Sequence, residues 1–449
     1  MDGSSVATAV TTARTSTPAR SIARAGVFTV AATGSTLLVN LATGILIARV
    51  LGPSGRGALT AVLAVPPIVA CVFEMGCAAA VTYHQARRPG DAPRLVGTWL
   101  VICFPLALAG TAAGWLLLPH LLAAQSEHTL MLARLLMLTL TIVFVADLMN
   151  GVVLGGQDFG FYNGLRVAQP LALALAYGAL WVAGVLTVST AVAAMVAVNV
   201  AATVALSFRV LRRHGLGRPS RAIARSTLWY GVRAHSTSTA GIVNSRLDVM
   251  IIPAFLGAAS VGLYSVATNV SWMVITVSGS LASIVFPAAA ARGLAGRYTV
   301  VKSLYATLAI AIVLAGTIAA VAGVAVRIVY GTDFAGSVTP LRILLIGTVL
   351  YAAAGVACSG LYAVNRPFTA ALAQFTAAAV TVAGLLLFLQ RGGIEAAAIV
   401  STVAYGLVFV IALALYRRTA GLTWRELVPA PSVMASWFRQ ATRGALGRA

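Results

Sequence analysis

Two stretches of this chain, one in each half, have similar sequences. The first, ILIARVLGPSGRGALTAVLA, occupies residues 45–64, and the second, MIIPAFLGAASVGLYSVATN, occupies residues 250–269. In both, apolar segments flank a short loop: Leu51-Gly52 aligns with Leu256-Gly257, and Gly57 aligns with Gly262. A second pair, GVVLGG at residues 151–156 and GVACSG at residues 355–360, lies at nearly the same offset. Two matches at a consistent offset predict an internal duplication.

The composition is that of a membrane protein. Of the 449 residues, 60% are hydrophobic and 9% are charged, and the mean hydropathy is +0.94. Soluble domains average about a quarter charged residues, so a soluble protein of this composition is excluded. The net charge of +21 is carried almost entirely by arginine, because Lys302 is the only lysine. We interpret this preference for arginine over lysine as a bias of the coding sequence and not as a binding surface. We therefore expect no nucleic-acid partner.

Cysteine and histidine give no sign of a metal or redox site. The four cysteines, Cys71, Cys77, Cys103 and Cys358, lie in apolar runs without a CxxC pair, which is typical of small buried hydrophobic residues. The five histidines lack the spacing of metal ligands. We therefore expect no metal and no cofactor.

Apolar length predicts an all-α, polytopic membrane protein. A spanning helix needs about 20 mostly apolar residues, and twelve segments meet this rule. They are residues 25–48, 58–82, 95–118, 129–153, 167–186, 188–211, 229–256, 261–286, 301–328, 337–361, 368–389 and 394–416.

The basic residues predict the orientation, because cytoplasmic segments carry an excess of arginine and lysine. With the N-terminus inside, the cytoplasmic segments hold most of them, notably Arg14, Arg20, Arg24, Arg87, Arg88, Arg94, Arg209, Arg212, Arg213, Arg218, Arg221, Arg225, Arg292, Arg297, Lys302 and Arg366. Both termini are therefore expected in the cytoplasm.

These spans divide the chain into five predicted parts. They are a disordered basic N-terminus (1–24), an N-terminal six-helix bundle (25–211), a basic cytoplasmic linker (212–228), a C-terminal six-helix bundle (229–416) and a cytoplasmic tail (417–449). In the tail, Met434, Trp437, Phe438 and Ala441 recur at helical spacing, which suits an interfacial helix; a plain solvated tail is the alternative.

An even number of spans per half makes the repeat parallel, with a pseudo-twofold axis along the membrane normal. Transporters with such repeats bind their substrate between the two bundles and move it by rocking one bundle against the other. This architecture favours a transporter over an enzyme or a receptor.

Charged side chains inside the spans mark a candidate site, because each costs about 3 kcal/mol at a helix centre. They are Glu74, Arg134, Asp147, Arg233, Arg246, Asp248 and Arg342. Arg233 and Asp147 lie near cytoplasmic ends, where snorkelling or capping explains them, and Arg134 and Arg342 have the same alternative near outer ends. Glu74, Arg246 and Asp248 lie deeper and predict a cavity.

The seventh span is the most polar. Asn244 and Asp248 are four apart and share a helix face, whereas Arg246 and Asp248 are two apart and point in nearly opposite directions. Each of these two charges therefore needs a partner elsewhere. Arginine in such a cavity suits bidentate contact with phosphate oxygens.

Three motifs resemble a known family. They are IARVLGPSGRG at residues 47–57; Arg246 and Asp248 followed by FLG at residues 255–257 and VGLY at residues 261–264; and GGQDFGFYNGLR at residues 155–166. Together with twelve spans in two halves, they resemble the polysaccharide flippase branch of the multidrug/oligosaccharidyl-lipid/polysaccharide exporter superfamily.

The resemblance implies a flippase, not an enzyme, that moves undecaprenyl-diphosphate-linked oligosaccharide across a bacterial cytoplasmic membrane by alternating access. Arg246, with Arg134 or Arg342, would offset the diphosphate charge, and Arg49 and Arg56 would receive it at the outer mouth. Membrane lipids, a glycan polymerase and glycosyltransferases are the further partners implied. No P-loop or hydrolytic constellation is visible in the sequence, and coupling to Na⁺ or H⁺ stays open.

Three other functions are kept as alternatives. A lipid II flippase has a similar plan, but the first span here has no interior charge. A cation-coupled multidrug exporter would need carboxylates to dominate its cavity. A non-transport scaffold for glycan assembly would tolerate the loss of the deep charges.

Overall fold

A computed structural model describes residues 19–427 except 245, 291–296 and 365. The regular structure in these ranges is helical. In the first half the helices are α1 (Ala19–Ala64), α2 (Pro66–Phe73), α3 (Cys77–Arg87), η1 (Pro89–Asp91), α4 (Ala92–Leu121), α5 (Glu127–Met137), α6 (Leu140–Gly155), α7 (Phe159–Val182) and α8 (Val188–His214). In the second half they are α9 (Arg221–Asn244), α10 (Leu247–Phe255), α11 (Ala258–Ala290), α12 (Arg297–Tyr330), η3 (Thr332–Ser337), α13 (Val338–Ala363), α14 (Pro367–Ala420) and α15 (Trp424–Leu427).

The all-α membrane fold is confirmed, whereas the count of twelve spans is not established. Eight described helices are long and apolar enough to cross a membrane, or nine if the bent pair α5 and α6 forms one span. Helix α14 has 54 residues, about 80 Å at 1.5 Å per residue, against a hydrocarbon core of about 30 Å. It is interrupted at Gly393 (φ 56°, ψ −146°). A Cβ on Gly384 would lie 2.8 Å from Val400 Cγ1, so its two legs pack against each other.

Helix α1 contains a similar interruption, and it explains the Leu-Gly-Pro of the repeated stretch. Gly52 has φ 64° and ψ −177°, a left-handed backbone region that glycine tolerates and other residues rarely adopt. Pro53 follows, and proline is well suited to the first turn of a helix because it lacks an N–H. The chain therefore leaves one helical leg at Gly52 and starts another at once.

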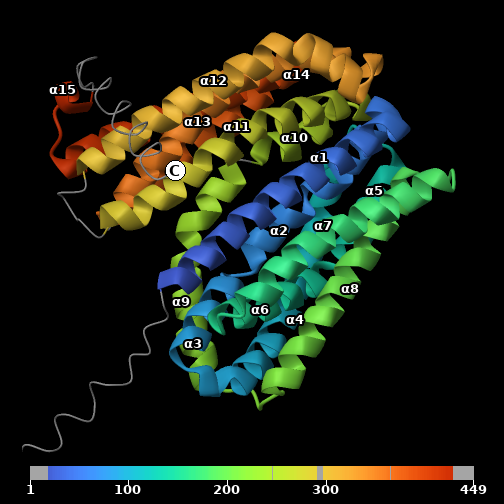
Figure 1. Cartoon of the computed structure of the whole chain (residues 1–449). Helices are drawn as coiled ribbons and strands as arrows, with labels where there is room; N and C mark the ends of the chain where they lie inside the picture. The colour runs from blue at the N-terminus through green and yellow to red at the C-terminus, as the bar shows by residue number, and fades with distance from the viewer. Residues whose placement is uncertain (1–18, 245, 291–296, 365, 428–449) are drawn as a thin grey trace, which may run out of the picture.

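The helices form two bundles with separate apolar cores. One core is built from residues between Ile47 and Val210, and two others come almost entirely from residues 247–427. In Figure 1 the two bundles converge toward the right of the view and diverge toward the left. Large exposed apolar side chains such as Leu116, Val182, Phe368 and Leu387 cover both bundles, as expected for surfaces that face lipid.

The same packing pattern recurs in both bundles, as a parallel repeat predicts. Helix α6 packs against α3 in the first bundle, and α13 packs against α11 in the second. Likewise α1 packs against α7, and α9 packs against α14. Helices of equivalent order in the two halves therefore have equivalent neighbours.

The two copies of the repeated stretch meet each other at the end where the bundles converge. A Cβ on Gly57 would lie 1.6 Å from the Ala258 carbonyl oxygen and 2.7 Å from the Gly262 nitrogen. A Cβ on Gly262 would lie 2.0 Å from the Pro53 carbonyl oxygen. The glycines that align in sequence thus form a backbone-to-backbone contact between the bundles, which we call the glycine contact. We call the end of the molecule that holds this contact the closed end.

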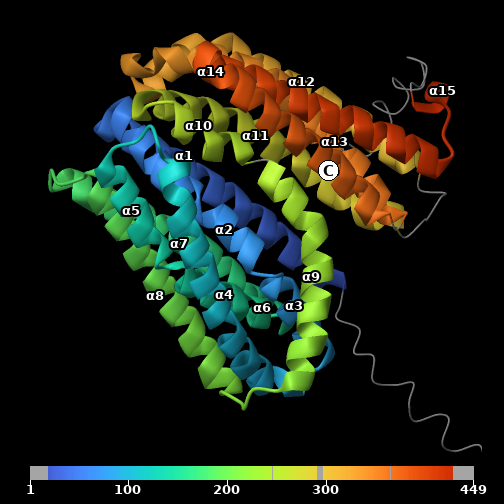
Figure 2. The same cartoon turned by 180° about the vertical axis from the view of Figure 1, so that it is seen from behind.

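Helix α9 bridges the two bundles toward the other end, as seen from behind in Figure 2. It packs against α3 and α4 of the first bundle and against α14 of the second. Trp99 Nε1 donates to Thr227 Oγ1 at 3.1 Å, and a Cβ on Gly76 would lie 2.4 Å from the Gly231 carbonyl oxygen. Helix α9, which lies in the predicted seventh span, is therefore attached to both bundles.

Several predicted boundaries differ from the structure. Helix α1 begins at Ala19, inside the expected disordered N-terminus, while residues 1–18 lie outside the described residues. Most of the expected linker 212–228 is helical, because α8 continues to His214 and α9 begins at Arg221. In the tail the described part contains only the end of α14 and the short α15, and the expected interfacial helix at residues 434–441 lies outside the described residues.

The GGQDFGFYNGLR stretch, which forms the turn between α6 and α7 and the start of α7, is tied to the end of α8. Asp158 caps α7 by accepting from the Phe161 N–H at 3.4 Å, and its Oδ2 lies 2.6 Å from Arg209 Nη2 and 3.1 Å from Arg213 Nη1. The hydrogen bond from Arg209 is the main reason that the pKa of Asp158 lies below its usual range. Its charge therefore stabilises the fold above the unfolded-state pKa of about 4, and this contribution is lost as the pH falls through the lower folded-state pKa.

We predict that Asp158→Asn lowers thermal stability slightly at neutral pH, because exposed ion pairs contribute about 0.2–1 kcal/mol each. The deficit should shrink as the pH falls below about 4. Asp158→Ala should cost more, by about 0.5–2 kcal/mol, because it also removes the helix cap. Thermal unfolding of the detergent-solubilised protein across this pH range checks the order; equal loss at every pH would contradict it.

We also predict that Gly57→Ala separates the bundles at the closed end, because the new methyl group would occupy the position of a backbone carbonyl. Spin labels at position 187, between α7 and α8, and at position 391, beside the Gly393 break of α14, should show a longer distance, and the unfolding temperature should fall. Gly323→Ala in α12, where a Cβ meets nothing within 4 Å, is the matched control. An unchanged label distance in Gly57→Ala would refute the glycine contact.

Candidate functional site

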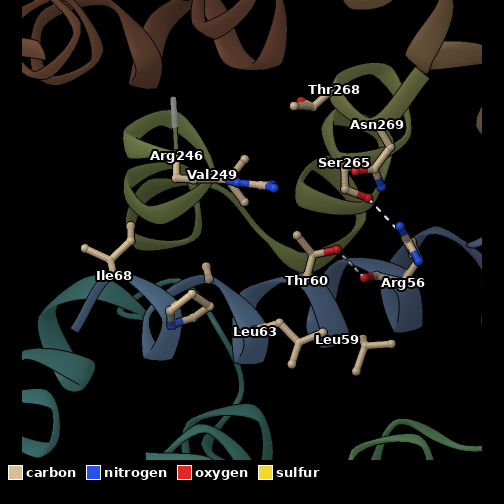
Figure 3. Close-up of a pocket in the computed structure, with 12 residues that line it drawn as sticks. Arg56, Leu59, Thr60, Leu63, Ile68, Arg246, Val249, Ser265, Thr268 and Asn269 are labelled. Atoms are coloured by element: carbon tan, nitrogen blue, oxygen red, sulfur yellow. Dashed lines mark hydrogen bonds between the residues drawn. The ribbon is translucent and has the colours of Figure 1, made fainter. Parts of the chain in front are cut away.

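A hollow of about 300 Å³ lies between the bundles, beside the glycine contact, and holds two arginines. Arg56 and Thr60 reach it from the second leg of α1, Arg246 from the junction of α9 and α10, and Ser265, Thr268 and Asn269 from α11. Figure 3 shows the side chains of Arg56 and Arg246 directed into the same space. We call it the dibasic pocket.

A break in the seventh span positions Arg246. Helix α9 ends at Asn244 and α10 begins at Leu247, and Arg246 between them has non-helical backbone angles (φ −127°, ψ −4°). Its side chain is exposed, and its guanidinium carbon lies 5.0 Å from the centre of the Trp272 ring. Stacking on an aromatic face holds a guanidinium in place while its donors stay available.

The repeated stretch positions Arg56. It lies one turn after Gly52, and its Nε donates to Ser265 Oγ at 3.3 Å. Ser265 belongs to the second copy of the stretch, so the two copies share a polar contact beside the glycine contact. We expected Arg56 at the outer mouth; the structure instead places it in the dibasic pocket, partly buried, because the leg that carries it turns inward after Gly52.

The dibasic pocket is cationic. Among the described residues that line it, Arg56 and Arg246 are charged and none is acidic. Two like charges in a membrane protein repel each other and each carries a cost of burial, unless water or an anion is present. Arginine donors form a planar fork that matches phosphate oxygens, so an anion with several oxygens suits this pocket.

Asp248 and Asn244 lie outside this pocket, contrary to expectation. Asp248 is 2% exposed; its Oδ2 accepts from Tyr264 Oη at 2.6 Å and from Ser401 Oγ at 3.2 Å. Asn244 is also buried and donates from Nδ2 to Gln374 Oε1 at 2.9 Å. Both side chains face the second bundle, where these bonds join α9 and α10 to α11 and α14. Arg246 lines the dibasic pocket, whereas Asp248 faces Tyr264 and Ser401; the helix break at Arg246 lies between them.

The other predicted cavity residues have local partners and do not line the dibasic pocket. Glu74 lies at the break between α2 and α3, where its Oε1 accepts from the Ala78 N–H at 3.2 Å. Arg134 lies over the Trp115 ring at 5.9 Å, and the exposed Arg342 donates to the Ala319 carbonyl at 3.3 Å.

Arg49, expected at the outer mouth, connects the bundles at the closed end. From α1 it donates to the carbonyl oxygens of Val329 and Ile328 at the end of α12. Gln125 makes a similar connection, donating to the Pro253 and Leu256 carbonyls at 3.1 and 2.8 Å. These bonds satisfy carbonyl groups that helix ends leave free, and they add to the glycine contact.

Sequence reasoning missed Ser265, Thr268 and Asn269. They occur at helical spacing within an otherwise apolar span, and such a polar stripe predicts a face toward a cavity. The signal was present, although it was weaker than that of the charged residues.

We predict that Asp248→Ala lowers the unfolding temperature of the solubilised protein, because it leaves the Tyr264 and Ser401 hydroxyls without their shared acceptor. Hydrogen bonds to a carboxylate contribute about 1.5–3 kcal/mol each. Asp248→Asn should cost less, since it retains an acceptor oxygen. Asp333→Ala, at an exposed position, is the control. Equal unfolding temperatures for Asp248→Ala and the wild type would show that this network does not stabilise the second bundle.

Solved structures of transporters share this fold. The chain matches a multidrug resistance MATE family transporter of the MOP superfamily in an inward-facing conformation, at 15% identity and a TM-score of 0.71, over 86% of this chain and 94% of that one. It matches the lipid II flippase MurJ in an inward closed conformation at 13% identity and a TM-score of 0.74, over 90% and 89%. An outward-facing MATE family transporter matches at 16% identity with a lower TM-score of 0.58, over 89% and 95%.

The sequence itself identifies the family. No curated protein matches it, but the family model described as polysaccharide biosynthesis protein matches residues 46–339, more than half of the chain. This match covers residues 46–64 and 250–269 of the first repeat pair, both pocket arginines and the glycine contact, and it confirms the resemblance predicted from the motifs. The chain is a multi-pass membrane protein with the fold of the MOP-superfamily transporters, and it belongs to the polysaccharide biosynthesis protein family.

Proposed function

We propose that this protein translocates undecaprenyl-diphosphate-linked oligosaccharide across the bacterial cytoplasmic membrane by alternating access, for the biosynthesis of cell-surface polysaccharide. The observation that carries the proposal is the dibasic pocket, in which Arg56 of the first bundle and Arg246 of the second line the same hollow. A diphosphate bound there would contact both bundles, so the position of one bundle relative to the other would decide which side of the membrane it faces.

The chemistry of the pocket fits this substrate. A diphosphate presents several anionic oxygens, and the forked donors of two arginines bind such oxygens in a bidentate manner. The prenyl chain remains in the bilayer, where it needs no polar partner. Only the diphosphate and its sugars therefore have to cross the membrane through a hydrated cavity. A cation-coupled multidrug exporter would need an acidic pocket, and the described lining of this one is basic.

The closed end is suited to reversible opening. The bundles meet there through glycine backbone and through apolar packing of α1, where Ala48 and Ile45 contact the core of the second bundle. The polar contacts are those of three side chains, Arg49, Arg56 and Gln125, with no ion pair among the described residues. Separating them frees a small set of polar groups, which water can satisfy, and uncovers the small apolar contact of Ala48 and Ile45. On this account the termini lie in the cytoplasm, on the side opposite to the closed end.

We predict that Arg246→Ala and Arg56→Ala each reduce translocation at least tenfold. The test uses proteoliposomes that contain a fluorescent prenyl-diphosphate oligosaccharide, with a membrane-impermeant quencher added outside. Arg246→Lys should retain partial activity, because lysine keeps the charge and loses the fork. Arg391→Ala, an exposed arginine near the Gly393 turn, is the control, and the recovered substrate should be chemically unchanged.

Two results would contradict the proposal. Full translocation by an Arg56→Ala, Arg246→Ala double variant would exclude the dibasic pocket as the substrate site. Transport of a cationic dye with no transport of the diphosphate would favour a multidrug exporter instead.

A further inference from the structure

A second hollow, of about 330 Å³, adjoins the dibasic pocket. The two share four lining residues, Arg56, Leu59, Leu63 and Asn269. Beyond this common wall the second hollow extends between α1, α7, α8 and the end of α12, and we call it the polar chamber. A group held at Arg56 therefore lies at the entrance of both spaces.

The polar groups of the chamber are nearly all uncharged. Apart from the shared Arg56, its polar lining consists of Asn40 and Thr43 from α1, Tyr177 from α7, Asn269 from α11 and Tyr330 from α12. Apolar side chains of both bundles, including Leu173, Met195 and Met273, complete the wall. Amides and hydroxyls beside apolar surface match a sugar ring, which carries hydroxyl groups at its rim and C–H groups on its faces.

The two asparagines are available to a ligand. Both are exposed although they lie on spans, and neither amide has a hydrogen-bond partner among the described residues. Within a bilayer, a polar group without a protein partner must face water or a ligand. Asn40 and Asn269 therefore need an occupant that supplies donors and acceptors, and they face it from different bundles.

The size and the charge of the chamber restrict that occupant. Its volume is at the lower end of the range for small-molecule pockets, about 300–1,000 Å³, so it fits a small part of a glycan and not the whole oligosaccharide. In the described lining of the chamber, Arg56 is the one cationic side chain that could pair with a sugar carboxylate. The same arginine is also needed to bind the phosphate. An acidic sugar would thus place its charge next to the diphosphate.

We propose that the polar chamber binds the sugar attached directly to the diphosphate and selects an uncharged one. This inference rests on the proposed function, because it assumes that the diphosphate occupies the dibasic pocket. Asn40 and Thr43 then act as residues that determine specificity, and Arg56 binds at the junction of phosphate and sugar.

The test compares three probes by calorimetric titration of the purified full-length protein. The probes are a short-chain prenyl diphosphate without sugar, the same diphosphate carrying N-acetylglucosamine, and the same diphosphate carrying glucuronic acid. The wild type should bind the N-acetylglucosamine probe about tenfold more tightly than the sugar-free probe. This is the gain expected from one or two additional hydrogen bonds between the sugar and the chamber. The glucuronic acid probe should gain nothing.

Asn40→Ala and, separately, Thr43→Val should bring the ratio of affinities for the N-acetylglucosamine and sugar-free probes close to one. Asn199→Ala is the matched control, since Asn199 accepts from Gln169 at 2.6 Å and lines neither hollow; it should leave the ratio unchanged. The comparison of probes on the wild type stands even if a variant fails to fold.

The outcomes separate this inference from the proposed function. If the wild type binds none of the diphosphates, the proposed function fails. If it binds all three equally well, or if the glucuronic acid probe binds as tightly as the N-acetylglucosamine probe, the diphosphate site stands and the assignment of the polar chamber is wrong.

Discussion

The structure depends on one close approach, the backbone contact between Gly57 and Gly262. No other residue type fits at either position, because a Cβ would overlap a carbonyl group of the opposite bundle. The contact brings the two copies of the repeated stretch together near the pseudo-twofold axis and fixes the end at which the bundles converge. The dibasic pocket and the polar chamber both lie beside it, since their shared residue Arg56 directly precedes Gly57. A side chain at this point would hold the bundles apart and change both hollows.

Helix breaks place the polar chemistry next to this contact. Arg246 lies in the break between α9 and α10, and Arg56 follows the break at Gly52. A break frees backbone groups from the helix, and inside a membrane these are tolerated only where protein or a wet cavity satisfies them. Both pocket arginines therefore lie at or one turn after a helix break, and both reach the same hollow between the bundles.

Much of the fold was predictable from the sequence, because apolar length and glycine spacing are local signals. The duplication of residues 45–64 at 250–269 predicted two related bundles, although it did not predict that the copies touch. The predicted site was less accurate. Asp248 and Arg246 are two residues apart and both charged, but only the surrounding helices decide that Asp248 meets Tyr264 and Ser401 while Arg246 faces the hollow. Arg56 was assigned to a loop because the inward turn at Gly52 depends on a backbone angle, and Asn269 was overlooked because an amide in an apolar span is a weaker signal than a charge.

The most direct test is a cryo-electron-microscopy structure of the full chain in a lipid nanodisc with a prenyl-diphosphate glycan bound. The account predicts density for the diphosphate between the guanidinium groups of Arg56 and Arg246, beside Gly57 and Gly262, with the prenyl chain leaving toward lipid. A structure in which Arg246 points into lipid, or in which dry helix packing fills the space between the two arginines, would contradict it.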